Sequence, residues 1–142
     1  MEVKNIMSGH VIAVGQDEPV TAAARLLKRY NIGALPVRDD RGRLRGMVTD
    51  RDIVLRCVAL EGDPQELKVR EIMSRDVRTV DAACSTDAAA AAMAREQVRR
   101  MPVMEGSRMV GMLSLGDLAR REKTGMEAAA ALSEISSNVR ST

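Results

Sequence analysis

One apolar stretch of the sequence ends in a hydroxyl residue that is followed, three positions later, by a carboxylate. The stretch reads Gly46-Met47-Val48, and Thr49 and Asp52 come after it. At the start of a helix, a hydroxyl oxygen and unpaired backbone N–H groups can bind a phosphate, while a carboxylate can accept hydrogen bonds from a ribose diol. The same spacing also forms a capping box, which stabilises a helix without any ligand. The motif therefore predicts a capped helix start and fits a nucleotide.

This set of residues occurs twice. Gly111-Met112-Leu113-Ser114 and Asp117 repeat it 65 positions later (117 minus 52), and Pro36-Val37 returns as Pro102-Val103 at a shift of 66 (102 minus 36). One residue is lost in the second hairpin. Each copy is too short to bury a sizeable core alone, so the repeat predicts two units packed with pseudo-two-fold symmetry and two related clefts between them.

The composition limits the classes of function. The chain has 142 residues, of which 45% are apolar and 30% charged, which predicts a globular, soluble protein. A net charge of +2 does not indicate a polyanion partner, and with Tyr30 as the single aromatic residue, nucleic-acid binding is less expected, because proteins commonly stack bases on aromatic side chains. One His, no cluster with metal-ligand spacing and no nucleophile or phosphate-loop motif argue against an enzyme and against a metal.

The ends and the cysteines fit a cytoplasmic protein. The N-terminus has no signal-peptide core, and no apolar run approaches the roughly 20 residues that span a bilayer, so no membrane partner is expected. Cys57 and Cys84 occupy unrelated positions in the two copies, which favours two free thiols.

The expected elements follow the order β-α-β-β-α in each copy, an α/β (α+β) fold class. In the first copy they are a strand at 11–14, a helix from 19 to 30, strands at 34–37 and 44–48, and a helix from Thr49. In the second copy they are a strand at 77–80, a helix at 85–96, strands at 101–104 and 109–113, and a helix from Ser114.

The repeat sets the expected domain boundaries. Residues 1–62 form the first repeat, 63–122 form the second, and 123–142 form a C-terminal helix, at 126–135, with a polar tail. The two repeats are expected to make one paired domain.

Five motifs in a fixed order carry a resemblance to a known family. They are Ile6-Met7-Ser8, Val11-x-x-Val14, Pro19-Val20-x-x-Ala23, Ile32-Gly33-Ala34-Leu35-Pro36-Val37 and Gly46-Met47-Val48-Thr49-Asp50-Arg51-Asp52. This order resembles the cystathionine-β-synthase (CBS) domain, and the second copy matches it again in register. The resemblance covers about residues 1–122. The chain is similar to stand-alone bacterial CBS pairs of the hypoxic-response type. It implies a Bateman module, commonly a homodimer, with no catalytic residues, whose clefts bind AMP, ADP, ATP, NAD or S-adenosylmethionine.

The resemblance also implies the site residues. The ribose-binding acids fall on Asp52 and Asp117, and the phosphate-facing hydroxyls on Thr49 and Ser114. The adenine walls and the cleft-lining segment before each Pro-Val fall on Met47, Val48, Met112, Leu113, Ile32, Gly33, Ala34, Arg99 and Arg100.

The two copies differ in the segment before Pro-Val. The first has Gly33-Ala34 where the second has Arg99-Arg100, so only the second brings guanidinium groups to a phosphate there. This difference predicts two sites with unequal affinity or phosphate preference. The alternative is that both arginines are solvated at a helix end and interact with its dipole.

Two functions follow. The first is a non-catalytic regulatory sensor that binds an adenosine nucleotide and signals to an unknown regulated protein. The second is a CBS pair that binds protein or nucleic acid without a ligand; retained dimerisation without nucleotide binding would favour it.

Overall fold

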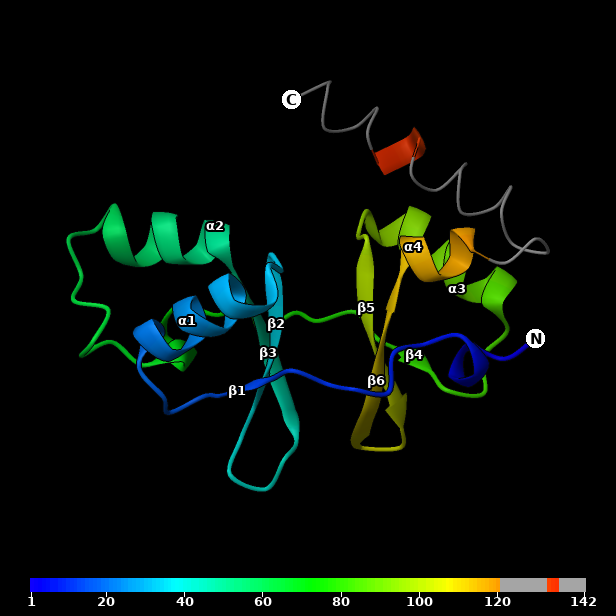
Figure 1. The fold of residues 1–142 in the computed structure, drawn as a ribbon, viewed down its shortest axis with the longest axis horizontal. Helices are drawn as coiled ribbons and strands as arrows, with labels where there is room; N and C mark the ends of the chain where they lie inside the picture. The colour runs from blue at the N-terminus through cyan, green and yellow to red at the C-terminus, as the bar shows by residue number, and fades with distance from the viewer. Residues whose placement is uncertain (121–132, 136–142) are drawn as a thin grey trace. The chain divides into compact units, whose positions relative to one another are not determined.

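The chain forms two compact units, and each unit includes the leading residues of the other sequence repeat. A computed structural model describes residues 1–120 and 133–135. Unit 2 is formed by Ile12–Val77, and unit 1 by Met1–Val11 together with Arg78–Thr142. The chain therefore starts in unit 1, builds the whole of unit 2 and returns to unit 1 (Figure 1).

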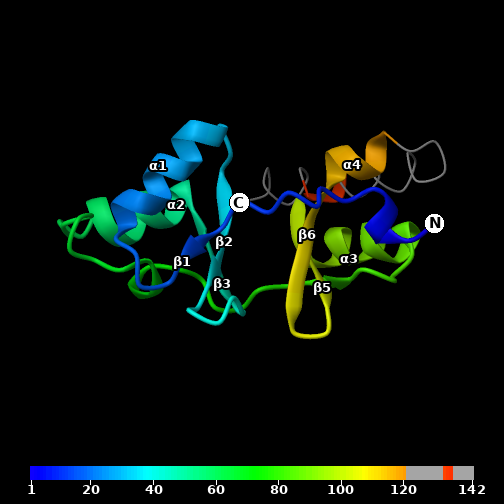
Figure 2. The same ribbon diagram turned by 60° about the horizontal axis from the view of Figure 1, so that its bottom comes forward.

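Unit 2 is a three-stranded sheet with its helices on one face (Figures 1 and 2). Strand order is β1-β2-β3, with β1 parallel to β2 and β2 antiparallel to β3. Its elements are β1 (Val14–Gly15), α1 (Val20–Tyr30), β2 (Ala34–Arg38), β3 (Leu44–Thr49), α2 (Asp50–Ile53), a π-helical turn η2 (Val54–Val58) and a 3₁₀ turn η3 (Val69–Glu71).

Helix α1 shows why the sequence folds in this way. Val20, Ala23 and Leu27 recur at helical spacing and are buried in the core of unit 2. The helix stops at Asn31, which adopts the left-handed conformation at φ 52°, and its N–H bonds back to the carbonyls of Leu27 and Lys28. The chain then turns directly into β2.

Unit 1 repeats this architecture. Its sheet has the order β4-β5-β6, with β4 parallel to β5 and β5 antiparallel to β6, and its helices again lie on one face (Figure 2). Its elements are a 3₁₀ turn η1 (Val3–Asn5), β4 (Val80–Asp81), α3 (Thr86–Glu96), β5 (Arg100–Glu105), β6 (Arg108–Ser114) and α4 (Leu115–Ala119).

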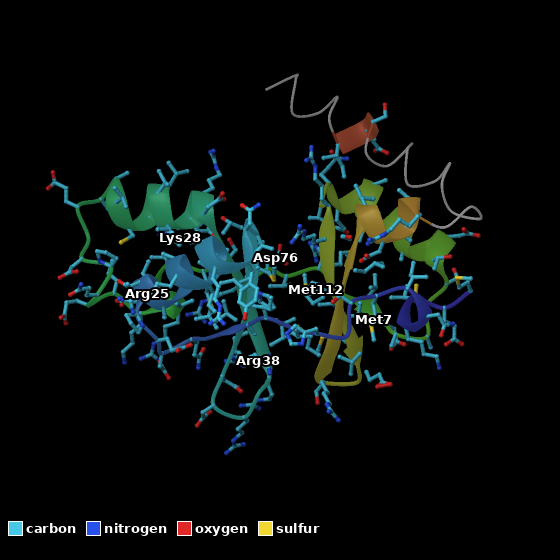
Figure 3. All side chains as sticks on the ribbon, in the orientation of Figure 1. Met7, Arg25, Lys28, Arg38, Asp76 and Met112 are labelled. Carbon is cyan, nitrogen blue, oxygen red and sulfur yellow. The ribbon has the colours of Figure 1, made fainter. Side chains whose placement is uncertain are left out.

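The segment that opens each sequence repeat docks on the other repeat's sheet. Residues 3–8 lie in unit 1, where Ser8 and Met112 exchange two backbone hydrogen bonds of 2.9 and 3.0 Å and Val3 donates to the carbonyl of Cys84. Figure 3 shows Met7 on this segment, near Met112 of β6. The first turn of the chain is therefore part of the core of unit 1.

Residues 69–74 make the equivalent contacts in unit 2. Ser74 and Met47 exchange backbone hydrogen bonds of 2.8 and 2.9 Å, and Val69 donates to the carbonyl of Glu18. Val69, Ile72 and Met73 are buried in the core of unit 2. The opening segment of the second repeat is thus structural and completes unit 2.

The structure confirms the α/β (α+β) fold class expected from the sequence. The expected positions of two strands are wrong. The expected strands at 11–14 and 77–80 are instead the two-residue strands β1 and β4. Only Val14–Gly15 and Val80–Asp81 face β2 and β5 in register, because the preceding residues form the connections between the units. The expected helix at 126–135 lies outside the described residues except Ser133–Ile135, which are helical, with Ile135 buried in the core of unit 1.

The exchange of leading segments makes a prediction with two matched variants. Val3 and Val69 are equivalent in the repeats, and both are fully buried, but in different units. We expect Val3→Ala to weaken unit 1 and Val69→Ala to weaken unit 2, each by about 2 kcal/mol of lost transfer energy and cavity formation. Hydrogen exchange measured by peptide should rise in β5 and β6 for Val3→Ala and in β2 and β3 for Val69→Ala. Faster hydrogen exchange in β2 and β3 for Val3→Ala, or in β5 and β6 for Val69→Ala, would contradict this placement of the two segments.

Candidate functional site

The predicted ribose acid and phosphate hydroxyl of unit 2 meet at the start of α2. Thr49 Oγ1 accepts a hydrogen bond from the backbone N–H of Asp52 at 3.0 Å, and Asp52 Oδ2 accepts one from the N–H of Thr49, also at 3.0 Å. The capping box predicted from the sequence is therefore present. It fixes both side chains and leaves the Thr49 hydroxyl hydrogen free to be donated.

The second oxygen of Asp52 has a different environment. Asp52 Oδ1 lies 3.8 Å from Nη1 of Arg56, one helical turn further on, which is too long for a hydrogen bond. The same nitrogen donates to the carbonyl of Ile72 at 3.1 Å and lies 3.4 Å from the carbonyl of Met73. One carboxylate oxygen is thus committed to the cap, and the other retains its capacity to accept.

Backbone contacts join the segment before Pro36 to this helix start. The N–H of Asp50 donates to the carbonyl of Gly33 at 3.1 Å, and Ala34 pairs with Thr49 across β2 and β3. Ile32 packs partly against the core of unit 2, whereas Gly33 is exposed. The structure therefore brings Gly33 and Ala34 beside Thr49 and leaves Ile32 as their support.

Unit 1 builds the same arrangement. Ser114 Oγ accepts from the N–H of Asp117 at 3.1 Å, and Asp117 Oδ2 accepts from the N–H of Ser114 at 2.9 Å, which completes a second capping box. Here Asp117 Oδ1 accepts a direct hydrogen bond from Arg120 Nη2. The free oxygen of the second acid is covered by an arginine, in contrast to that of Asp52.

Both arginines before Pro102 lie at this second site. The N–H of Leu115 donates to the carbonyl of Arg99 at 3.0 Å, and Arg100 pairs with Ser114 across β5 and β6. Both side chains are exposed. Since α3 ends at Glu96 and Arg100 is the first residue of β5, the alternative of a helix-end arginine does not describe Arg100.

The predicted adenine-wall residues divide into two kinds. Met47 and Met112 are half-buried, while Val48 and Leu113 have no exposed surface and belong to the two cores. Alternation along β3 and β6 causes this difference, because successive side chains point to opposite faces of a sheet. A role for any of the four toward a base stays a prediction.

Arg56 and Arg120 are the residues that the sequence reasoning missed. Each follows its aspartate by one helical turn, at i+4 for Asp52 and i+3 for Asp117. Acid-to-arginine spacings of three or four on a helix indicate contact, so the signal was present in the sequence.

The two cysteines are not part of either capped helix start. Cys57 and Cys84 are free thiols, as predicted; burial and the nearby Asp81 charge raise the pKa of the Cys84 thiol. Within residues 1–120 and 133–135, no group of three or more His, Cys, Asp or Glu side chains could hold a metal ion. In the same part of the chain, no helix is both long and apolar enough to cross a membrane.

The repeated motif has a counterpart in known proteins. The family model of the CBS domain matches residues 3–58 and again residues 69–123. This chain belongs to the CBS domain family. Both copies of the capped helix start lie within the matched residues, so the two CBS domains of this chain each carry one candidate site.

Relatives cover nearly the whole chain. The CBS domain-containing protein YhcV of Bacillus subtilis is 38% identical over 134 residues, which are 94% of each chain. Hypoxic response protein 1 of Mycobacterium tuberculosis is 40% identical over 82% of each chain. A crystal structure of Hypoxic Response Protein I with two coordinated zinc ions aligns with a TM-score of 0.78 and 39% identity, over 85% of this chain and 98% of that chain.

One solved relative contains adenosine compounds. The CBS domain pair of protein MJ0100, in complex with 5′-methylthioadenosine and S-adenosyl-L-methionine, aligns with a TM-score of 0.71 and 30% identity. The alignment covers 84% of this chain and 94% of that chain.

The capping role can be measured without any ligand. Thr49→Ala removes the side-chain acceptor for the N–H of Asp52, and we expect it to lower the free energy of unfolding by about 0.5–2 kcal/mol. Thr49→Asn keeps an acceptor and should lie within a few tenths of a kcal/mol of the unchanged protein. Urea unfolding of the nucleotide-free protein measures the free energy of unfolding of both variants. An equal decrease in Thr49→Ala and Thr49→Asn would contradict the capping role.

Proposed function

We propose that this chain is a non-catalytic regulatory module that binds an adenosine-containing nucleotide of the AMP, ADP or ATP class at the two capped helix starts. One observation carries the proposal: in each unit the cap commits one oxygen of the aspartate and leaves Oδ1 without a backbone partner, beside a hydroxyl that can still donate. The adenosine compounds bound to the CBS pair of MJ0100 support the same class of ligand.

Each group has a specific part in this proposal. Asp52 accepts hydrogen bonds from a ribose diol through Oδ1. At Asp117, a ribose takes the place of Arg120 on the same oxygen. Thr49 and Ser114 donate their hydroxyl hydrogen to a phosphate oxygen. Met47 and Met112 present thioether side chains that can pack on a base where no aromatic is available. All of these interactions are non-covalent, so the module acts only through its different affinity for two states.

We further propose that the module works as a homodimer and signals to a protein partner. Four large apolar side chains are exposed on one stretch of unit 2: Val54, Leu55, Val58 and Leu60. Val54, Leu55 and Val58 follow one another at spacings of one and three on η2, and such a contiguous apolar face favours a protein interface. The same face is the observation that favours the alternative function, an interaction module that needs no ligand.

A nucleotide panel tests the proposal and separates it from the alternative. Nucleotide-free protein is titrated calorimetrically with adenosine, AMP, ADP, ATP, NAD, S-adenosylmethionine and GTP. We expect selective binding of adenosine compounds and a loss of about 1–3 kcal/mol at one site in Asp52→Ala and at the other in Asp117→Ala, because each removes a charged acceptor. Asp40→Ala, in the exposed turn at the opposite end of β2 and β3, is the matched control. Retained oligomerisation with no binding of any compound would establish the alternative instead.

The difference between the two sites makes its own prediction. Arg99→Ala and Arg100→Ala should each weaken ATP binding about tenfold and leave adenosine binding unchanged, because a charge-assisted hydrogen bond to phosphate is lost. Arg108→Ala removes an arginine from the opposite end of β6 and should change neither affinity. An equal loss for ATP and adenosine in the Arg100 variant would remove the phosphate role.

A further inference from the structure

We propose that Arg56 is a positioning residue that couples nucleotide binding at Asp52 to the docking of segment 69–74 on unit 2. This proposal rests on the proposed function, since it assigns a regulation to that same site. Segment 69–74 is the last structured stretch before the chain leaves unit 2 at Val77. A change in its docking would therefore be passed directly into the connection between the units.

The guanidinium of Arg56 faces two competing sets of acceptors. Its Nη1 donates to the carbonyl of Ile72 at 3.1 Å and lies 3.4 Å from that of Met73, and it stands 3.8 Å from Asp52 Oδ1. These carbonyls follow the 3₁₀ turn η3, at a helix end where carbonyls lack partners in the turn itself. With segment 69–74 docked, the arginine is held on the backbone and the Asp52 oxygen remains open.

In unit 1, an arginine at a different position of the repeat contacts the equivalent aspartate oxygen. Arg120 donates directly to Asp117 Oδ1. Arg120 corresponds to Leu55 in the first repeat, and the counterpart of Arg56 is Arg121 (56 plus 65), which lies outside the described residues. This contact shows that the aspartate oxygen left free by the cap can accept from a nearby arginine.

The acceptors that surround Arg56 give the direction of the coupling. If segment 69–74 undocks, Arg56 loses the carbonyls of Ile72 and Met73, and its remaining acceptor is Asp52 Oδ1, the oxygen that the ribose needs. A nucleotide that occupies Oδ1 in turn leaves Arg56 to the carbonyls and favours the docked segment. Because coupling between two equilibria is reciprocal, each event promotes the other.

Two backbone contacts allow this docking to be measured by hydrogen exchange. The N–H of Ser74 donates to the carbonyl of Met47, and that of Val69 to the carbonyl of Glu18, so both amides exchange faster when the segment leaves unit 2. Met47 is also a predicted adenine-wall residue, which places the reporter next to the site.

The test is hydrogen exchange of the full chain with and without AMP, with AMP affinity measured in parallel. In the unchanged protein, we expect AMP to slow exchange in peptides covering 69–77 by about three- to tenfold, the size of a charge-assisted contact. Arg56→Met should still bind AMP but lose this slowing, and without AMP its 69–77 peptides should already exchange faster. Arg120→Met removes the arginine that contacts Asp117 in unit 1 and should leave peptides 69–77 as in the unchanged protein.

The outcomes separate this proposal from the proposed function. AMP bound at Asp52 with no slowing at 69–77, or the same slowing in Arg56→Met, would overturn the coupling and leave nucleotide binding intact. No binding of any adenosine compound would overturn both. A loss of AMP affinity in Arg56→Met as large as in Asp52→Ala would make Arg56 a ligand-binding residue and overturn its positioning role.

Discussion

The close approach of a leading segment to a glycine of the last strand is the contact on which each unit depends. A Cβ on Gly46 would lie 2.6 Å from the carbonyl oxygen of Ser74, and one on Gly111 would lie 2.6 Å from that of Ser8. Real side chains do not tolerate such distances, so glycine is required at both positions. This approach lets Met73 and Met7 lie against the sheets and sets the backbone pairs that hold the segments.

The same strands carry the candidate sites, so the cores and the candidate sites share strands. Gly46 is followed by Met47, whose backbone forms hydrogen bonds with Ser74, and then by Thr49, which caps α2. A displacement of the segment would act on the strand that ends at the cap. The segment therefore supports the strand that ends at the capping box, and the capping box fixes the side chains of Thr49 and Asp52.

The two units have the same arrangement of strands and capped helix start, but different charged side chains around it. Unit 1 has three exposed arginines around its helix start: Arg99, Arg100 and Arg120. The corresponding positions of the first two in unit 2 are Gly33 and Ala34, and Arg56 is engaged with backbone carbonyls. Repeats with the same backbone arrangement thus place different charges around the same cap.

The sequence by itself determined the repeat, the order of the elements and the two capped helix starts. Helical spacing of Val20, Ala23 and Leu27, and the three-residue spacing of Thr49 and Asp52, are local properties that neighbouring residues decide. Only the tertiary structure decided that residues 69–74 complete unit 2, that the strands at Val14 and Val80 are two residues long, and that Arg56 reaches the carbonyls of Ile72 and Met73. These features join residues that are distant in sequence, so no local pattern specifies them.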